Sequence, residues 1–292
     1  MGYFFRIVSF EFQFLMSNQK IYFLVGHFSK DLLKGESFQL GGTVFYSGIL
    51  AKKLGFKVNI LTSYGKDLKE KVKNESLLQK TKIFNLTSQK STTFKNIYLK
   101  NQNKRKQYLL SLARKITLKN LSKNYRTQIL HLAPIFNEID PKITKKFKAD
   151  FVGATLQGWL RKRNAKFRVM FSLWKDYKKF LPNFDAAICS IEDIKNNFSV
   201  AKEFAKYSKL FVLTTGERGC VIFEKSKITE IFPTKVLRNG YFTGAGDVFA
   251  SAFFIKFYET KNPYLSGEFA NKVAGLHIEQ SSKRLFDFNP RN

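Results

Sequence analysis

Apolar runs alternate with helix-like segments along most of the chain. Several short runs are almost continuously apolar, which predicts strands buried on both faces of a parallel sheet. The predicted strands are residues 21–28, 57–62, 129–132, 150–154, 186–189 and 209–213. The predicted helices are residues 43–54, 67–73, 141–147, 200–207, 246–258 and 268–278. This alternation predicts an α/β fold with a mostly parallel central sheet.

A different pattern occupies residues 90–112. Thr93, Ile97 and Leu99 lie on either side of polar positions, and a polar turn separates them from the apolar residues of 107–112. This spacing predicts a β-hairpin outside the main sheet. No internal repeat and no linker between two cores is visible, so residues 16–292 are expected to form one domain.

The segment from Thr243 to Asp247 reads Thr-Gly-Ala-Gly-Asp and runs directly into an apolar helical pattern. Small residues allow a tight turn and a close approach of a ligand. The first turn of the helix offers backbone N–H groups and the positive end of a dipole to phosphate oxygens. Because a carboxylate there would repel phosphate, Asp247 is better explained as the base that takes the proton of an attacking hydroxyl. The alternative is a Gly-rich turn whose Asp only caps a core helix.

Four blocks in order resemble the ribokinase-like (PfkB) family of carbohydrate kinases. They are G-x(4)-D at residues 26–31, L-G-G-T at 40–43, the Thr/Gly-rich segment 213–219 and G-A-G-D at 244–247. The resemblance covers residues 21 to 280. It implies a ribokinase-like three-layer sandwich with a small β lid built from segments 32–42 and 90–112.

The resemblance also assigns roles to single residues. It implies that Asp31, Gly41 and Gly42 bind the substrate and that Asp247 is the general base. The backbone of Gly244, Ala245 and Gly246 would then be the anion hole, and Thr215, Gly216, Thr243 and Asn271 would contact ATP. The residues themselves also allow plainer interpretations, namely a turn before a helix at Gly41-Gly42, a solvated loop carboxylate at Asp31 and an exposed helix position at Asn271.

Metal binding has weaker support in the sequence. The family often has N-x-x-E after a central strand, where this chain has Ser190-Ile-Glu192-Asp193. Glu192 or Asp193 could supply the charge for Mg²⁺ indirectly, whereas a Ser N-cap followed by acidic residues explains the same letters. The family usually writes D-x-T-G-A-G-D, but this chain has Tyr241, so activation by a monovalent cation is doubtful.

A narrower resemblance involves inositol 3-kinases. Thr92-Thr93, Glu138 and the Gln-Gly-Trp-Leu-Arg segment at 157–161 are similar to segments that recur in that branch. This implies a polyol substrate, with myo-inositol leading and other sugars or nucleosides open. Gln157 and Arg161 would contact substrate or phosphate; a buried Gln and a solvated Arg are the alternatives.

Composition restricts the other classes. The 292 residues contain two cysteines and carry a formal net charge of +29. Two cysteines make no disulfide framework, and no run of eighteen apolar residues predicts a membrane span. We therefore expect a cytoplasmic protein without a membrane partner. Because the basic residues are spread along the chain, a biased, solvated surface explains the charge better than nucleic-acid binding does.

The Phe-rich residues 1–15 precede the point where the family resemblance begins. Arg6 and Glu11 interrupt this stretch, which lacks the features of a signal peptide. We expect a loosely packed extension, with Met16 as the native start. Three functional hypotheses remain open: a polyol or sugar kinase, a catalytically weakened relative that binds or assembles, and a basic nucleic-acid-associated protein. Relatives commonly form homodimers through lid strands, which nothing in the sequence decides.

Overall fold

A single mixed sheet forms the middle of the protein, which a computed structural model describes over residues 19–33, 37–98, 105–235, 240 and 242–280. Its strands are β1 Ile21–Val25, β4 Lys57–Thr62, β5 Lys82–Asn85, β8 Tyr125–Leu132, β9 Phe147–Thr155, β12 Ala186–Ser190, β13 Phe211–Thr214, β14 Cys220–Glu224 and β15 Lys227–Ile231. Within the described residues their order is β15-β14-β13-β12-β9-β8-β1-β4-β5. Strands β13 through β5 are parallel, and β14 and β15 are antiparallel at one edge.

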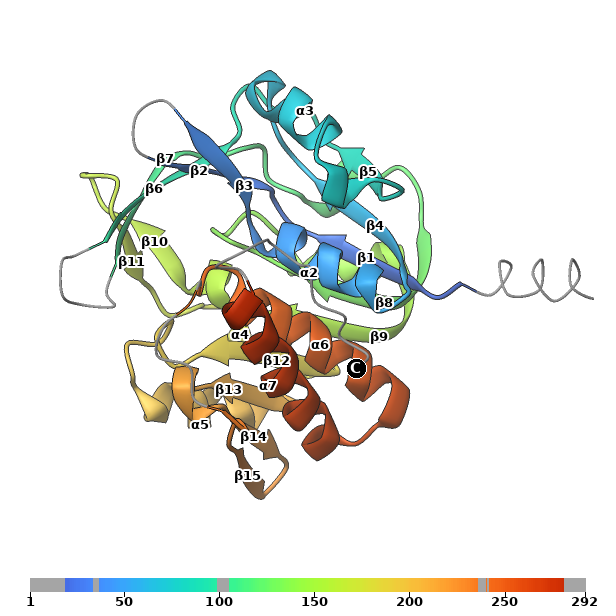
Figure 1. The fold of residues 1–292 in the computed structure, drawn as a ribbon, viewed down its shortest axis with the longest axis vertical. Coiled ribbons are helices and arrows are strands. Elements are labelled where there is room, and N and C mark those ends of the chain that lie inside the picture. The colour runs from blue at the N-terminus through green and yellow to red at the C-terminus, as the bar shows by residue number, and fades with distance from the viewer. Residues whose placement is uncertain (1–18, 34–36, 99–104, 236–239, 241, 281–292) are drawn as a thin grey trace, which may run out of the picture.

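Helices cover both faces of the sheet, which confirms the predicted three-layer α/β fold. The α-helices are α2 Thr43–Lys53, α3 Lys66–Lys73, α4 Tyr177–Phe180, α5 Phe198–Tyr207, α6 Ala245–Thr260 and α7 Pro263–Gln280. The 3₁₀ helices are Ser76–Leu78, Leu118–Asn120, Pro141–Lys146, Gln157–Leu160, Leu181–Asn183 and Gly216–Arg218. The long helices α2, α6 and α7 cover one face (Figure 1). The other face is covered by α4, α5 and short 3₁₀ segments.

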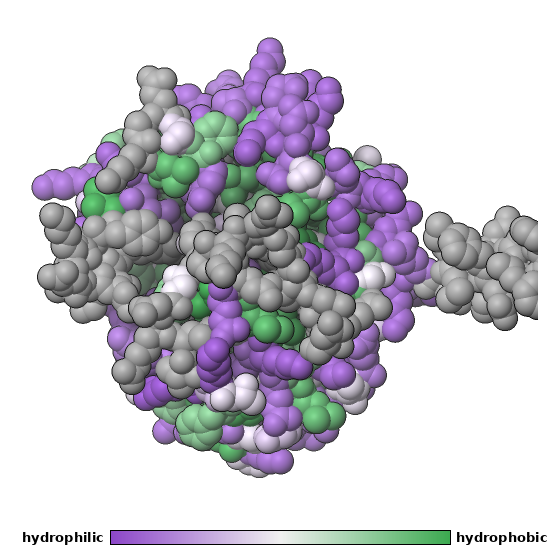
Figure 2. Space-filling view, in the orientation of Figure 1, coloured by the Kyte–Doolittle hydropathy of each residue, from purple (hydrophilic) through white to green (hydrophobic). Residues whose placement is uncertain are grey.

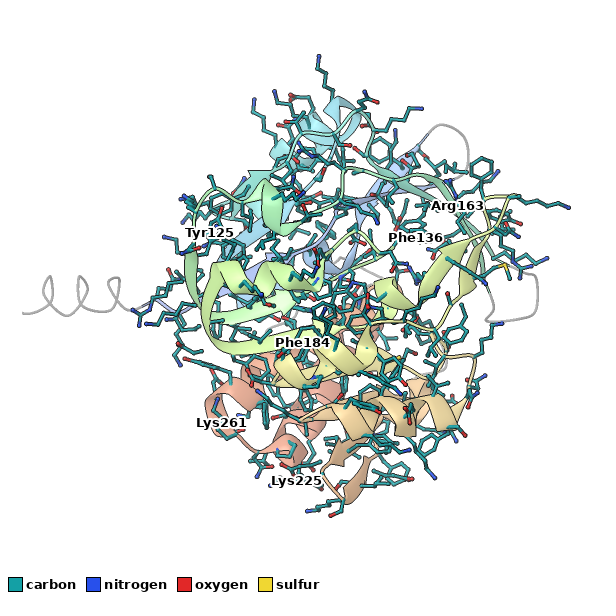
Figure 3. The ribbon with its side chains drawn as sticks, turned by 180° about the vertical axis from the view of Figure 1, so that it is seen from behind. Tyr125, Phe136, Arg163, Phe184, Lys225 and Lys261 are labelled. Atoms are coloured by element: carbon teal, nitrogen blue, oxygen red, sulfur yellow. The ribbon has the colours of Figure 1, made fainter. Side chains whose placement is uncertain are left out.

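Strand β1 shows why the sheet needs both layers. Tyr22 and Leu24 belong to the hydrophobic cluster under the long helices, whereas Phe23 and Val25 belong to the cluster on the other face. Successive side chains of a strand point to opposite faces, so a continuously apolar strand must be covered twice. On the second face Phe184 is buried near the centre of the molecule (Figure 3).

A second sheet forms the lid. It contains β2 Ser29–Leu32, β3 Phe38–Gly41, β6 Thr92–Tyr98 and β7 Arg105–Ser111, in the order β3-β2-β6-β7. The hairpin predicted at residues 90–112 is therefore confirmed, and its turn lies outside the described residues. The small hairpin of β10 Arg161–Arg163 and β11 Val169–Phe171 lies beside β7 (Figure 1).

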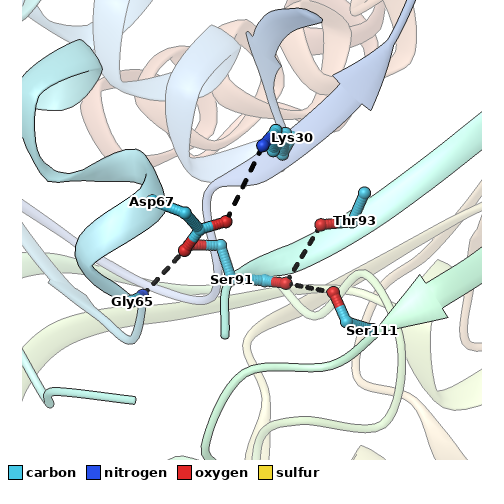
Figure 4. A network of polar contacts seen from close by, with 6 residues as sticks. All are labelled: Lys30, Gly65, Asp67, Ser91, Thr93 and Ser111. Carbon is cyan, nitrogen blue, oxygen red and sulfur yellow. Dashed lines mark hydrogen bonds and ion pairs between the residues drawn. The ribbon is translucent and has the colours of Figure 1, made fainter. Parts of the chain in front are cut away.

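Polar contacts attach the lid to the start of α3 (Figure 4). The buried Ser91 donates from its hydroxyl to Asp67 Oδ1 at 2.8 Å and accepts from the Gly65 amide at 3.0 Å. Lys30 on β2 forms an ion pair with Asp67 Oδ2 at 3.9 Å. Ser111 at the end of β7 donates to the Ser91 carbonyl at 2.6 Å. Ser91 thus joins the β6–β7 hairpin to the body, and Lys30 joins β2 to the same Asp67.

Several predicted boundaries are wrong, and the reasons are physical. The helix expected at 141–147 is a 3₁₀ helix that ends at Lys146, because Phe147 already pairs with Tyr125 in the parallel ladder. The strand expected at 21–28 ends at Val25, and lid strand β2 begins at Ser29 rather than near residue 32. The antiparallel pair β14–β15, although Cys220–Glu224 is apolar and strand-like, was not predicted.

The cysteines, the helices and the surface bear on the predicted compartment. Both cysteines are free and buried, and burial raises the pKa of the Cys220 thiol to about 12. Among the described residues no helix is long and apolar enough to cross a bilayer. Hydrophilic residues are spread around the periphery of the face in Figure 2. The extension predicted at residues 1–15 lies outside the described residues.

Candidate active site

Two helices begin at glycines with a positive φ, and these two starts define the candidate site. Gly42 has φ 94° at the N-cap of α2, and Gly244 has φ 82° at the N-cap of α6. Neither helix start has a side-chain cap, so the backbone alone forms both. A glycine adopts these angles at little cost, whereas a residue with a Cβ is strained there.

Helix α2 brings the two starts together. A Cβ on Gly244 would lie 2.4 Å from Tyr46 Cδ1, so the α6 start rests on this ring. Ser47 donates its hydroxyl to the Asp247 carbonyl at 2.8 Å, and Ser251 donates to the Ser47 carbonyl at 3.1 Å. Tyr46 and Ser47 follow Gly42 by four and five residues, which is about 6 to 8 Å along a helix axis. The predicted substrate glycines therefore lie about one helical turn from the predicted catalytic turn.

The predicted substrate residues also contact one another. Strands β2 and β3 pair Ser29 with Gly41, and a Cβ on Gly41 would lie 2.5 Å from Asp31 Oδ2. Asp31 therefore lies on lid strand β2 with its carboxylate against Gly41. This places a carboxylate of the lid beside the start of α2, where a hydroxylated molecule would find both a charged acceptor and backbone groups.

Open space distinguishes the glycines expected to face phosphate. A Cβ on Gly246 or on Gly216 would meet no atom within 4 Å, and both residues are exposed. By contrast, Gly41, Gly42, Gly219 and Gly244 are packed against protein atoms. The Ala245 amide donates to the Phe242 carbonyl at 3.2 Å, so the amides that follow it are better placed for a ligand. Room for an anion thus exists at both predicted phosphate glycines.

The residues predicted to contact the nucleotide lie at the Gly216–Arg218 3₁₀ helix, on α7 and just before α6. Thr215 donates its hydroxyl to the Gly219 carbonyl at 3.1 Å and closes this turn. Asn271 donates to the Ile231 carbonyl at 3.1 Å, and its amide lies against Gly219. The side chain of Asn271 therefore joins α7 to β15 in this structure. Thr243 accepts a hydrogen bond at its carbonyl from His277 at 2.9 Å.

The acidic pair after β12 is built into its own loop. Asp193 accepts from the Ser190 amide at 3.2 Å and from Gln157 Nε2 at 3.3 Å. The Ser190 hydroxyl accepts from the Glu192 amide at 3.2 Å, as an N-cap does. No group of three His, Cys, Asp or Glu residues in the described part of the chain could hold a metal alone. Mg²⁺ needs only one or two carboxylates when substrate phosphates and water complete its shell, so this donor set fits an indirect site.

Gln157 and Arg161 are not brought together as a pair. Gln157 contacts Asp193, whereas Arg161 donates from Nη1 to the Ile135 carbonyl at 3.0 Å, beside the lid. Both side chains are half-buried. Their bonds link the 157–161 segment to two different loops at the carboxyl edge of the sheet.

A cluster of buried polar residues around His27 lies at this edge, and the sequence did not predict it. His27 lies directly after β1; its Nδ1 is 2.8 Å from Thr92 Oγ1 on the lid and its Nε2 is 2.9 Å from the Arg114 carbonyl. Burial lowers the pKa of His27, and the neighbouring Glu138 and the Arg114 carbonyl oppose this shift. Glu138 is itself fully buried and accepts from the amides of Ile135 and Phe136. Sequence patterns noted Thr92 and Glu138 only by resemblance, because their partners are far away in the chain.

Comparisons with known proteins identify the family and the fold. Residues 47–287 match the model of the pfkB family of carbohydrate kinases. No curated protein sequence matches the chain. A solved pyrophosphate-dependent kinase in the ribokinase family, complexed with a pyrophosphate analog and myo-inositol, is similar at 20% identity and TM-score 0.75, over 89% of this chain and 95% of that one.

Two further solved structures are similar in fold. The nucleoside kinase of Methanocaldococcus jannaschii shares 19% identity at TM-score 0.62, over 89% of this chain and 92% of that one. Ribokinase of Arabidopsis thaliana, complexed with ribose and ATP, shares 15% identity at TM-score 0.63, over 89% and 93%. These likenesses support the α/β fold with its large, mostly parallel sheet.

Proposed function

The chain belongs to the pfkB family of carbohydrate kinases, and on that premise we propose that it transfers the γ-phosphate of ATP to a hydroxyl of a small polyol, with myo-inositol as the leading acceptor. The observation that carries this proposal is the contact between the starts of α2 and α6. It brings Asp31, Gly41 and Gly42 within about one helical turn of the segment that holds Asp247.

The chemistry follows from these positions. The acceptor hydroxyl forms a new O–P bond as the bond from the γ-phosphorus to the bridging oxygen breaks, and Asp247 takes the hydroxyl proton. The amides of the first α6 turn, where Gly246 leaves open space, stabilise the charge on the transferring group. Asp31 orients the acceptor by accepting from its hydroxyls.

Mg²⁺ would neutralise charge on the donor phosphates. Glu192 and Asp193 are the carboxylates that would hold it indirectly, through water. Asp193 keeps its orientation because Ser190 and Gln157 both donate to it. Thr215 and Gly216 lie after β13 at the same edge of the sheet and would contact the donor phosphates.

Pyrophosphate is the second candidate donor. The observation that favours it is the higher TM-score to the pyrophosphate-dependent kinase than to the Arabidopsis ribokinase that holds ATP. A site in which the first α6 turn and the open Gly216 contact phosphates alone would accept either donor. ATP would be preferred over pyrophosphate at such a site if contacts to its adenine and ribose add binding energy.

A two-donor, multi-acceptor assay tests the proposal. Purified protein is given Mg–ATP or Mg–pyrophosphate with myo-inositol, pentoses, hexoses or nucleosides, and the phosphorylated product is detected by ³¹P NMR. We expect one acceptor to turn over with one donor, and the Asp247→Asn variant to lose that turnover while retaining donor binding. Absence of product with every pair, although the donor binds, would contradict a kinase of this acceptor class. Equal turnover by Asp247→Asn would contradict the assigned base.

A further inference from the structure

A buried histidine on α7 forms a hydrogen bond to the predicted anion-hole turn, which begins a different helix, α6. His277 is fully buried, and its Nε2 lies 2.9 Å from the Thr243 carbonyl oxygen. A carbonyl can only accept, so Nε2 carries the hydrogen and donates. Burial lowers the pKa of His277 and the bond to Thr243 opposes the shift, so the neutral ring with hydrogen on Nε2 is the form that fits near neutral pH.

The same turn is held by neighbours on two more sides. A Cβ on Gly240 would lie 2.5 Å from Ile278 Cγ2, so the residue next to His277 packs against the start of this loop. Tyr46 of α2 lies against Gly244 and meets the His277 ring edge-on, with centroids 6.1 Å apart at 78°. Helices α2 and α7 thus enclose the turn between them.

The position of this turn decides where the amides of α6 point. Gly244 provides no side-chain cap, and Thr243 directly precedes it. The His277 bond is a directional contact to the backbone of the turn, whereas the Tyr46 and Ile278 contacts are packing. A donor hydrogen bond fixes both distance and angle, which packing alone does not.

We propose that His277 is a positioning residue that holds the anion-hole turn in place through the Thr243 carbonyl and thereby sets the affinity for the phosphoryl donor. The inference rests on the proposed phosphotransfer and deepens it. His277 does not touch either substrate. Its loss acts on the donor side of the site, because its bond is to the turn that begins α6, whereas Asp31 and Gly41 lie at the start of α2.

Two substitutions separate the hydrogen bond from the packing. His277→Phe keeps an aromatic ring against Tyr46 and removes the donor, whereas His277→Gln keeps an N–H group at a similar reach. We expect His277→Phe to lower kcat/KM for the donor by about tenfold, mainly through a higher donor KM, which is the size of one lost hydrogen bond. The KM for the acceptor stays within twofold, and His277→Gln recovers most of the loss.

A matched control lies one helical turn earlier. Val273 is fully buried on the same helix and its side chain cannot donate a hydrogen bond to the turn, so Val273→Ala lowers the thermal midpoint without changing the donor KM. Donor and acceptor constants of His277→Phe that stay within twofold of wild type would overturn the inference. An equal rise in both KM values, unrescued by Gln, would do the same.

Donor binding by calorimetry keeps this inference separate from the proposed function. If wild type binds Mg–ATP or Mg–pyrophosphate but transfers nothing, weaker binding by His277→Phe still supports positioning while the kinase proposal fails. If wild type binds neither donor, both fail. Should His277→Phe not fold, ¹⁵N shifts of the wild-type ring decide: hydrogen on Nε2 supports the inference, and hydrogen on Nδ1 overturns it.

Discussion

The starts of α2 and α6 use the same backbone device for different chemistry. Both have a glycine with a positive φ at the N-cap and no side-chain cap. The first turn of α2 contains no acidic residue, whereas the first turn of α6 contains Asp247. The carboxylate beside the α2 start is Asp31, which comes from the lid and lies against Gly41. The carboxylate of Asp247 belongs to the α6 turn itself and provides a proton acceptor next to the anion site.

Their surroundings differ as well. Gly42 has a backbone carbonyl 2.5 Å from its hypothetical Cβ, and Gly41 has the Asp31 carboxylate at the same distance. At α6, Gly244 is crowded by Tyr46, but Gly246 two residues later has open space. The α2 start is therefore shaped by the lid, and the α6 start leaves room for a ligand. This difference leads us to assign the acceptor to the first and the phosphoryl group to the second.

The largest effect is expected from the substitution that removes the chemical difference between the two helix starts. Asp247→Asn keeps the helix start and deletes the base, so kcat should fall by about 10²- to 10⁴-fold. Steady-state assays with the best donor and acceptor measure it. Asp193→Asn is the comparison variant, because the role proposed for its carboxylate is Mg²⁺ binding and not proton transfer. A smaller loss in Asp247→Asn than in this variant would contradict the comparison.

The next effect distinguishes a crowded glycine from an open one. Gly244→Ala forces a Cβ into Tyr46 at a left-handed residue, which costs about 1 to 3 kcal/mol in folding free energy. A displaced turn should also lower kcat by about 100-fold. Urea denaturation and kinetics measure both. A stability equal to wild type would show that the turn adapts to the added atom.

Gly246→Ala is the matched variant in the same turn. Its Cβ meets no protein atom, so stability should not fall, and replacing a helical glycine can even add about 0.5 to 1 kcal/mol. The methyl group would occupy the ligand's space, so the donor KM should rise about tenfold. A destabilised Gly246→Ala with unchanged donor KM would contradict the assignment of this space to phosphate.

The sequence predicted motifs better than it predicted their surroundings. The presence of six buried strands, the hairpin at 90–112 and the two helix starts followed from apolar runs, turn residues and glycine spacing. The order of the strands in the sheet, and strands β5, β14 and β15, did not. The sequence did not show that Gly244 packs against Tyr46 whereas Gly246 faces open space. That difference depends on a contact between residues about 200 positions apart in the chain. The bond between Gln157 and Asp193 was hidden for the same reason.

A substitution at the proposed acceptor site is expected to have an intermediate effect. Asp31→Asn keeps the shape of the carboxylate against Gly41 but removes its charge, so the acceptor KM should rise about 10- to 100-fold, the size of a charge-assisted hydrogen bond. The donor KM should change less than twofold. Two-substrate kinetics separate these constants. A larger change in the donor KM than in the acceptor KM would reverse the assignment of the two helix starts.

The smallest effect tests the contact that joins the two starts. Ser47→Ala removes the hydroxyl that donates to the Asp247 carbonyl but leaves the buried packing of α2 on α6, so unfolding free energy should fall by about 0.5 to 1.5 kcal/mol. If this bond sets the spacing between acceptor and base, kcat falls several-fold while both KM values hold, because both binding sites remain intact. Ser251→Ala is the control: it removes the neighbouring bond between the same helices, to Ser47, without touching Asp247. Equal losses of kcat in the two variants would mean that general packing of α2 on α6, rather than the bond at Asp247, keeps the two starts in register.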